Sequence, residues 1–195
     1  MSLEDRGYSV LVASSSEGFN AALSPLLSEN AFLPAHTVSS ISAAQRILSQ
    51  RSFDFVIINS PLPDDAGIRF AIDSCTGKGT VVLLLVKAEI QPGVHEKVVG
   101  HGVFTLPRPL SRQSMIQALE WMASARERLR RIEKKTVSLE DKMEEIRLVN
   151  RAKWLLISEL KMDEPQAHRY IEKQAMDTCV TRRQIAEKIL RTYSS

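Results

Sequence analysis

The chain has 195 residues, with 26 Lys and Arg against 23 Asp and Glu, 44% hydrophobic residues and 25% charged residues. These fractions are those of a globular protein, which excludes collagen-like and strongly disordered chains. The sequence contains neither an apolar run of about eighteen residues nor a charged start followed by an apolar signal core, so we predict a cytoplasmic protein without a membrane span.

The distribution of charge and the placement of cysteine and histidine indicate which partners and sites to expect. Residues 1–110 carry a net charge of −2 and residues 111–195 a net charge of +5, which weakly favours a polyanionic partner for the second half. The two cysteines are far apart and the four histidines have no ligand spacing. We therefore expect buried thiols, and no disulfide framework, metal or cofactor.

Short apolar runs alternate with amphipathic stretches over the first 110 residues. Strands are predicted at 8–13, 36–38, 55–58, 80–86 and 103–106, helices at 17–27, 41–48 and around Val94, and a loop at 61–67. Alternating units with continuous apolar strands predict an α/β fold with a parallel sheet covered on both faces, in the doubly wound order of flavodoxin-like proteins. Its site is expected at the carboxyl ends of the strands.

This order of elements and the run from Phe55 to Gly67 (FVIINSPLPDDAG) resemble the receiver domain of bacterial response regulators over residues 8–125. The resemblance implies an acidic pair that binds Mg²⁺ after the first strand and a phosphate-accepting Asp that closes the third. It also implies a Thr or Ser at the end of the fourth strand and a Lys before a Pro after the fifth. The residues at these positions are instead Ser14 and Ser15, Asn59, Val86 and Arg108.

These departures remove the chemistry of phosphoryl transfer, which needs a nucleophilic carboxylate and a hard cation held by oxygen ligands. We therefore predict a degenerate receiver that is not phosphorylated in the usual way. Asp64 and Asp65 are the remaining candidates for an acceptor, although such residues more often form turns and helix caps. Arg108, followed by Pro109, is interpreted as a surface residue or as a holder of an anion or a partner's carboxylate.

A helix is predicted from Ser111 to Asp163, because this stretch contains neither Gly nor Pro. At about 1.5 Å per residue it would span roughly 75 Å, so it is expected to project and find a partner. Its seam, defined by alternating steps of three and four, predicts a parallel coiled-coil dimer, with a charged single helix as the alternative. The seam residues are Met115, Ala118, Met122, Ala125, Leu129, Ile132, Thr136, Leu139, Met143, Ile146 and Asn150.

Beyond Ile146 the pattern changes to that of a small helical bundle. Two capping pairs, Asp163 with Gln166 and Thr181 with Gln184, each precede a short amphipathic stretch. We predict a three-helix bundle over residues 146–195, whose first helix is the end of the long one.

The bundle sequence resembles the ANTAR domain, the transcription antitermination module of bacterial regulators, over residues 146–191. The matching positions are Ala152, Lys153, Leu156, Ala167, Tyr170, Ala175 and Ala186. The resemblance implies dimers that bind paired RNA hairpins in a nascent leader and so prevent a terminator from forming. One departure is Trp154, where the family usually has Gly.

Residues 146–195 carry a net charge of +4, and basic side chains beside an aromatic ring suit the splayed bases and backbone of an RNA hairpin loop. On the predicted first helix, Arg147, Arg151 and Trp154 share one face, and Lys153 is assigned to phosphate contact. Arg182 and Arg183 begin the third helix. Trp154 is interpreted either as a stacking platform or as a packing residue, and Tyr170 as a core residue with its hydroxyl at the surface.

The sequence thus predicts a degenerate receiver-like domain (1–110), a coiled-coil linker (111–145) and an ANTAR RNA-binding domain (146–195). The predicted function is a non-enzymatic, homodimeric antitermination regulator, controlled by a partner protein or small ligand at the receiver domain. The alternative is a protein-interaction adaptor in which Trp154 anchors a protein partner. DNA recognition by the last two helices is a third reading, disfavoured because no glycine turn joins them.

Overall fold

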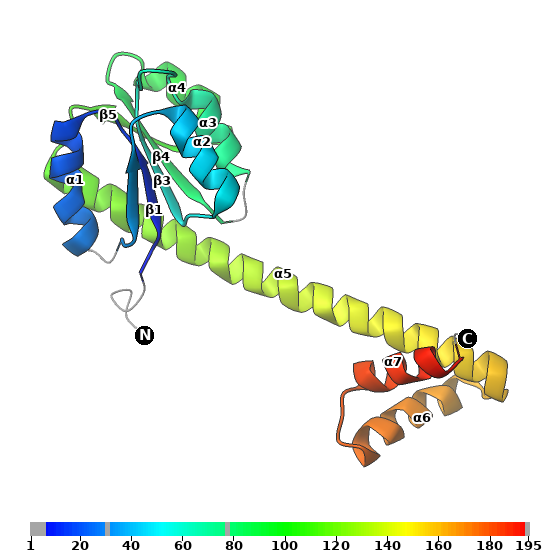
Figure 1. Ribbon diagram of the computed structural model, residues 1–195. Helices are drawn as coiled ribbons and strands as arrows, with labels where there is room; N and C mark the ends of the chain where they lie inside the picture. Colours follow the sequence, from blue (N-terminus) through cyan, green and yellow to red (C-terminus); the bar gives the residue numbers. More distant parts are fainter. Residues whose placement is uncertain (1–6, 30–31, 77–78, 194–195) are drawn as a thin grey trace. The chain divides into compact units, whose positions relative to one another are not determined.

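The computed structural model describes residues 7–29, 32–76 and 79–193 and divides the chain into two compact units, Met1–Arg131 and Ile132–Ser195 (Figure 1). We refer to them as the first unit and the second unit. Within the described ranges, no helix has both the length and the hydrophobicity needed to cross a membrane.

Five parallel strands in the order β2-β1-β3-β4-β5 form the sheet of the first unit. The strands are β1 (Val10–Ala13), β2 (Ala35–Val38), β3 (Phe55–Asn59), β4 (Val81–Lys87) and β5 (Phe104–Arg108). The central strands β1 and β3 are buried along their whole length, as expected for a sheet covered on both faces. The predicted flavodoxin-like α/β fold is therefore confirmed.

Helices cover both faces of this sheet (Figure 1). On one face lie α1 (Glu17–Glu29) and the first part of α5 (Arg112–Leu160), and on the other lie α2 (Ile41–Gln50), α3 (Ile68–Cys75) and α4 (Gln91–Val98), which continues into the short 3-10 helix η2 (Val99–His101). Successive residues of a strand point to opposite faces, so Val10 and Val12 pack with α1 and α5, whereas Leu11 and Ala13 pack with α2.

Helix α3 was not predicted. It begins directly after Gly67, whose φ of 75° is left-handed, and buries only Phe70 and Ala71. A Cβ at Gly67 would lie 2.9 Å from the Ile58 side chain, so the close approach of this turn to β3 requires glycine. Because the helix has eight residues and two buried side chains, too few apolar positions repeat for a helical pattern to be recognised in the sequence.

The second unit is a three-helix bundle formed by the end of α5, α6 (Glu164–Asp177) and α7 (Arg182–Tyr193). Its core consists of Ala152, Leu156, Ala167, Ile171, Ala175, Ile185, Ala186 and Ile189. Both predicted capping pairs are present. Gln166 N donates to Asp163 Oδ1 at 2.7 Å, and Gln184 N donates to Thr181 Oγ1 at 3.2 Å. Each glutamine side chain accepts the backbone N–H of its partner in return.

Two non-glycine residues adopt left-handed backbone at the turns of this bundle, Lys161 (φ 56°) and Cys179 (φ 53°). At the end of α6, Val180 N donates to Ala175 O and Cys179 N donates to Met176 O, the pair of hydrogen bonds that ends many helices at a glycine. A tight turn therefore joins α6 to α7 without glycine, so the lack of a glycine between them does not argue against a helix-turn-helix. Cys179 is also exposed, so the expectation of two buried thiols is wrong.

The long helix is confirmed, but its seam is not uniform. Met115, Ala118 and Met122 are buried against the sheet of the first unit, so they are not available to a second chain. From Leu129 to Ile146 the apolar seam residues are exposed, at 36% for Leu129 and 60% for Leu139. The exposed part of the seam therefore begins near Leu129, because the earlier turns of α5 complete the α/β fold.

Candidate functional sites

A neutral hydrogen-bonded pair occupies the centre of the site where a receiver would hold its phosphate acceptor. Asn59, the last residue of β3, donates from Nδ2 to Ser14 Oγ at 3.1 Å, and both residues are at least 97% buried. Ser14 Oγ also accepts from Ser16 N at 3.2 Å, while Ser15 is exposed. Over the described residues, no group of three His, Cys, Asp or Glu side chains is placed to hold a metal ion.

The assignment of Val86 to this site is wrong. Val86 is 1% exposed and packs with α2, α3 and α4, whereas the cavity that Asn59 lines is bounded by α1 and α5. Because side chains alternate along a strand, the residue of β4 on the same side as Asn59 at this end of the sheet is Lys87. Lys87 is exposed and in register with Arg108, so two basic residues end β4 and β5.

Arg108 is not a surface residue. It is half-buried, and its Nη2 donates to the backbone carbonyl of Ser60, which follows the acceptor position. The side chain therefore joins the end of β5 to the loop after β3.

Asp64 and Asp65 have structural partners. Asp64 accepts hydrogen bonds from the backbone N–H groups of Ile41 and Ser42, both at 2.9 Å, and so caps the start of α2. These bonds lower the pKa of Asp64 to about 2. Asp65 accepts from Gly67 N at 2.5 Å and shapes the turn before α3.

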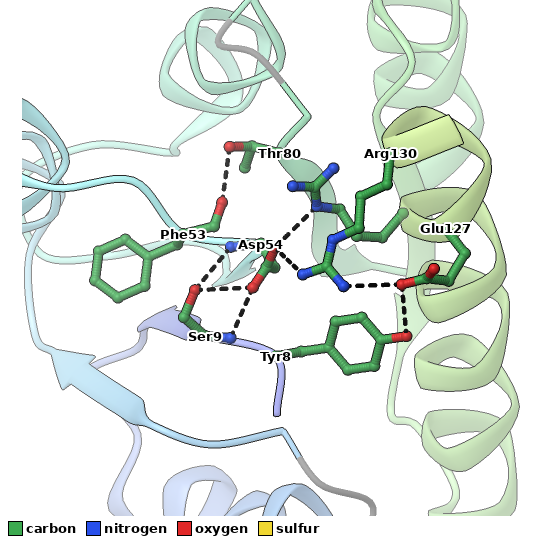
Figure 2. Close-up of polar contacts among 8 residues, drawn as sticks. Tyr8, Ser9, Phe53, Asp54, Thr80, Glu127 and Arg130 are labelled. Carbon is green, nitrogen blue, oxygen red and sulfur yellow. Dashed lines mark hydrogen bonds and ion pairs between the residues drawn. The ribbon is translucent and has the colours of Figure 1, made fainter. Parts of the chain in front are cut away.

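A cluster of charged side chains at the opposite end of the sheet attaches α5 to the first unit (Figure 2). Asp54 Oδ1 accepts from Arg126 Nε and from Arg130 Nη2, each at 2.9 Å, and Asp54 Oδ2 accepts from the backbone and hydroxyl of Ser9. Arg130 also pairs with Glu127 at 2.9 Å. We call Asp54, Arg126, Arg130 and Glu127 the α5 clamp.

The clamp is shielded from solvent, since the side chains of Asp54 and Arg126 are 15% and 13% exposed. Burial by itself would raise the pKa of Asp54, but the hydrogen bonds from Arg126 and Ser9 and the charge of Arg130 bring this pKa below its ordinary value. The clamp could not be predicted from the sequence, because Asp54 lies 72 residues from Arg126 and 76 residues from Arg130 and none of the three belongs to a motif.

In the second unit, one face of α5 carries two exposed arginines and an exposed indole. Arg147 and Arg151 are exposed, and Trp154 is 71% exposed. Within the described residues neither arginine forms an ion pair. Of the two readings of Trp154, packing inside the bundle is therefore excluded, and the ring is presented to solvent beside two free cations.

The other basic residues singled out from the sequence are held in ion pairs. Lys153 Nζ lies 2.7 Å from Glu164 Oε1, and this hydrogen bond lowers the pKa of Glu164. Arg182 lies 3.5 Å from Glu145 and 3.7 Å from Glu172. The Arg183 guanidinium is 3.1 Å from Glu187 and 4.0 Å from Glu144.

Helix α6 adds exposed groups that the sequence analysis did not select. Arg169 and Lys173 are exposed one turn apart, and Met176 is 78% exposed. Tyr170 is 39% exposed and does not belong to the core cluster of the bundle, so its ring is not a core residue as predicted. The signal that would have found Arg169 and Lys173 is their spacing of four on a helix whose buried face is Ala167, Ile171 and Ala175.

Comparison with known proteins finds a match within the second unit. Residues 138–190 match the ANTAR domain. The chain is also 29% identical over 143 residues to the transcriptional regulatory protein PdtaR of Mycobacterium tuberculosis, in the CDC 1551 and H37Rv strains, and the match covers 73% of this chain and 69% of the relative.

The first unit is similar in fold to solved receiver domains. The signal receiver domain of an HD domain-containing protein from Pseudomonas fluorescens superposes with a TM-score of 0.57 at 22% identity, covering 65% of this chain and 93% of that one. The chemotaxis response regulator CheY4 of Vibrio cholerae gives a TM-score of 0.53 at 19% identity, covering 60% and 99%. At these identities the likeness concerns the fold alone.

Proposed function

We propose that this chain, an ANTAR response regulator with a receiver-type domain ahead of its ANTAR domain, acts as a non-enzymatic dimeric antiterminator that binds paired RNA hairpins in leader transcripts. The single observation that carries the proposal is the face of α5 with Arg147, Arg151 and Trp154, inside the ANTAR match. Two unpaired guanidinium groups beside an exposed indole suit a hairpin loop, because its bases can stack on the indole ring while its phosphates contact the guanidinium groups.

Lys153, Arg182 and Arg183 have a secondary role in this proposal. Each is already paired with a carboxylate, so binding a phosphate would exchange one anion for another. Their contribution to affinity is therefore expected to be smaller than that of Arg147 and Arg151. Arg169 and Lys173 on α6 are further candidates for backbone contacts.

Dimerisation is proposed through the exposed part of the seam on α5. Ile132, Leu139, Met143 and Ile146 are each 51–60% exposed in the single chain. A stripe of large apolar side chains at heptad spacing is stable in water when a second helix covers it. Two copies joined along this stripe would present two RNA-binding faces to two hairpins.

We further propose that the first unit is a pseudo-receiver that takes its input from a partner protein or small ligand. The supporting geometry is the neutral Ser14–Asn59 pair in place of carboxylates, with the side chain of Val86 on the other face of the sheet. Acetyl phosphate with Mg²⁺ should leave the chain unlabelled, whereas stoichiometric labelling would overturn this part of the proposal.

The main test is a gel shift with three probes of equal length: an RNA with two hairpins in tandem, an RNA with a single hairpin, and a DNA duplex. We expect the tandem RNA to bind most tightly, with an affinity that falls steeply as salt rises. An adaptor protein would bind none of the three, and a helix-turn-helix protein would prefer the duplex. Either result, with the protein dimeric and folded, would reject the RNA-binding proposal.

A further inference from the structure

Charged side chains line both flanks of the exposed seam on α5. In coiled-coil notation Leu139 and Ile146 occupy d positions and Met143 an a position. The residue just before each a position (g) and the residue just after each d position (e) lie at the edges of the seam. All of these edge residues between 135 and 147 are exposed. They are Lys135 and Lys142 at g, and Glu140 and Arg147 at e.

The bundle of the second unit leaves both flanks of the seam open. Helix α7 reaches α5 through ion pairs with Glu144 and Glu145, which lie on the side of α5 away from the seam. In the part of the chain that the structure describes, no ion pair involves Lys142 or Arg147. Both side chains are therefore available to groups outside their own chain.

The charges on the two flanks complement each other only when two copies lie parallel along the seam. In a parallel pair, the g residue of one heptad lies beside the e residue of the partner's next heptad. Lys135 then faces Glu140 of the partner subunit, and Arg128 and Glu133 repeat this order of charges one heptad earlier. An antiparallel pair would instead set g against g and e against e, which brings like charges together.

The following heptad departs from this complementarity. There Lys142 faces Arg147 of the partner subunit, and the twofold symmetry of a dimer creates the same juxtaposition twice. Two cations side by side repel each other, so the coiled coil is weakened where the face with Arg147, Arg151 and Trp154 begins. An anion between the two cations would turn this repulsion into attraction.

We propose that Lys142 of one protomer and Arg147 of the partner subunit form a composite site for a phosphate group of the bound RNA. The inference rests on the proposed function and adds a residue of the second chain to the face of Arg147, Arg151 and Trp154. Each hairpin then contacts both chains, and the two symmetric sites match two hairpins. RNA binding and dimerisation are coupled, because the phosphate bridges two cations that only the dimer brings together.

The first test measures the full-length dimer without RNA. Lys142→Glu and Arg147→Glu each turn a repulsive pair into an attractive one at both symmetric positions. Each variant should therefore lower the dissociation constant of the dimer roughly tenfold in fluorescence-detected sedimentation. The double variant again opposes like charges, now negative, and should dissociate like wild type.

Lys134→Glu is the matched control for these variants. It makes the same charge change at an exposed residue of α5 that lies off the seam, so it should leave the dissociation constant near the wild-type value. Single variants that dissociate like wild type, or a double variant whose dimer is tighter than that of either single variant, would overturn the proposed pairing.

The second test asks whether the two cations act from different chains. Lys142→Ala and Arg147→Ala should each bind a single RNA hairpin roughly tenfold more weakly than wild type in a gel shift. When equal amounts of the two variants exchange subunits, every mixed dimer contains one intact pair, with Lys142 from one chain and Arg147 from the other. Part of the mixture should therefore bind the hairpin with wild-type affinity.

The failures of this inference and of the proposed function can be told apart. A wild-type dimer that binds no hairpin rejects the proposed function. A wild-type dimer that binds the hairpin, beside a mixture that shows no recovery although native mass spectrometry detects mixed dimers, rejects the composite site alone. Hairpin binding by Lys142→Ala with wild-type affinity has the same meaning.

Discussion

Two pairs of arginines on helix α5 show how differently the same residue type is used in the two units. Arg126 and Arg130, one turn apart, share the carboxylate of Asp54 and are largely shielded from solvent. Arg147 and Arg151, also one turn apart, are exposed and have no ion pair within the described residues. The first pair attaches the helix to its own domain, whereas the second is available to an external anion.

The difference comes from what surrounds each pair. Asp54 directly precedes the central strand β3, at the amino end of a buried sheet. The guanidinium groups that reach it therefore lose water and gain a fixed anion. The bundle of the second unit supplies carboxylates to Lys153, Arg182 and Arg183, but none to the face of Arg147 and Arg151. A positive charge on a helix therefore indicates a binding surface only where the fold provides no internal anion.

The largest effect is expected where the exposed seam is broken. Leu139→Asp combined with Met143→Asp places two charges in the proposed dimer interface, and neither residue belongs to the core of the bundle. We expect a monomer by light scattering and a loss of roughly 10²–10⁴-fold in affinity for a tandem hairpin, because binding of the second hairpin is no longer intramolecular. Val137→Asp is the control, since Val137 is 57% exposed but lies off the seam. A monomeric Val137→Asp protein beside a dimeric double variant would place the interface elsewhere.

The next effect concerns the α5 clamp. Asp54→Ala removes the carboxylate that the partly buried Arg126 and Arg130 share, which should cost about 3 kcal/mol of the free energy of unfolding of the first unit. Urea unfolding followed by Trp121 fluorescence in a Trp154→Phe background measures this unit alone. Glu29→Ala removes the exposed pair with Arg112 and should cost less than about 1 kcal/mol. Equal losses in the two variants would mean that the clamp contributes no more than a surface ion pair.

A smaller effect is expected at the free arginines of the second unit. Arg147→Ala with Arg151→Ala should lower RNA affinity about 10- to 100-fold and reduce the slope of log affinity against log salt by roughly 1–2, because two phosphate contacts are lost. Arg128→Ala with Arg131→Ala is the matched control, as both residues are exposed on the same helix in the first unit. A salt slope that falls equally in both double variants would indicate a general charge effect.

The smallest effect is a pH dependence at the start of α2. Since hydrogen bonds lower the pKa of Asp64 from its ordinary 3.8 to about 2, its contribution to stability is complete above pH 4 and is lost as pH falls toward 2. Asp64→Asn should therefore be less stable than wild type at pH 5, with the gap closing at low pH in urea titrations. Asp73→Asn, in an exposed pair with Arg69, should follow the wild-type curve. A gap that persists unchanged at pH 2 would show that Asp64 acts through something other than its charge.

Much of the fold could be predicted because its signals are local. The capping pairs Asp163–Gln166 and Thr181–Gln184 form as expected, since a cap depends only on residues within one turn of it. The sheet follows from continuous apolar runs bounded by turns. Helix α3 was not predicted, because a helix of eight residues with two buried side chains shows too few repeating apolar positions.

The functional positions were less predictable. Asn59 was placed correctly at the end of β3. Val86, however, is one residue before Lys87, the residue of β4 that lies on the same side of the sheet as Asn59. Because side chains alternate along a strand, this shift of one residue puts the side chain of Val86 on the opposite face. The interpretation of Arg108 as a surface residue failed because its partner, the carbonyl of Ser60, is 48 residues distant.

The sequence by itself determined the order of the strands, the doubly wound sheet, the long helix and the capped bundle, because period, caps and breakers act over a few residues. Only the tertiary structure decided which turns of α5 belong to the first unit, which arginines already have an anion and which face of β4 each side chain occupies. Those outcomes depend on groups brought together across 40 to 80 residues, for example Asp54 with Arg126 and Arg130, and no local pattern encodes such pairings.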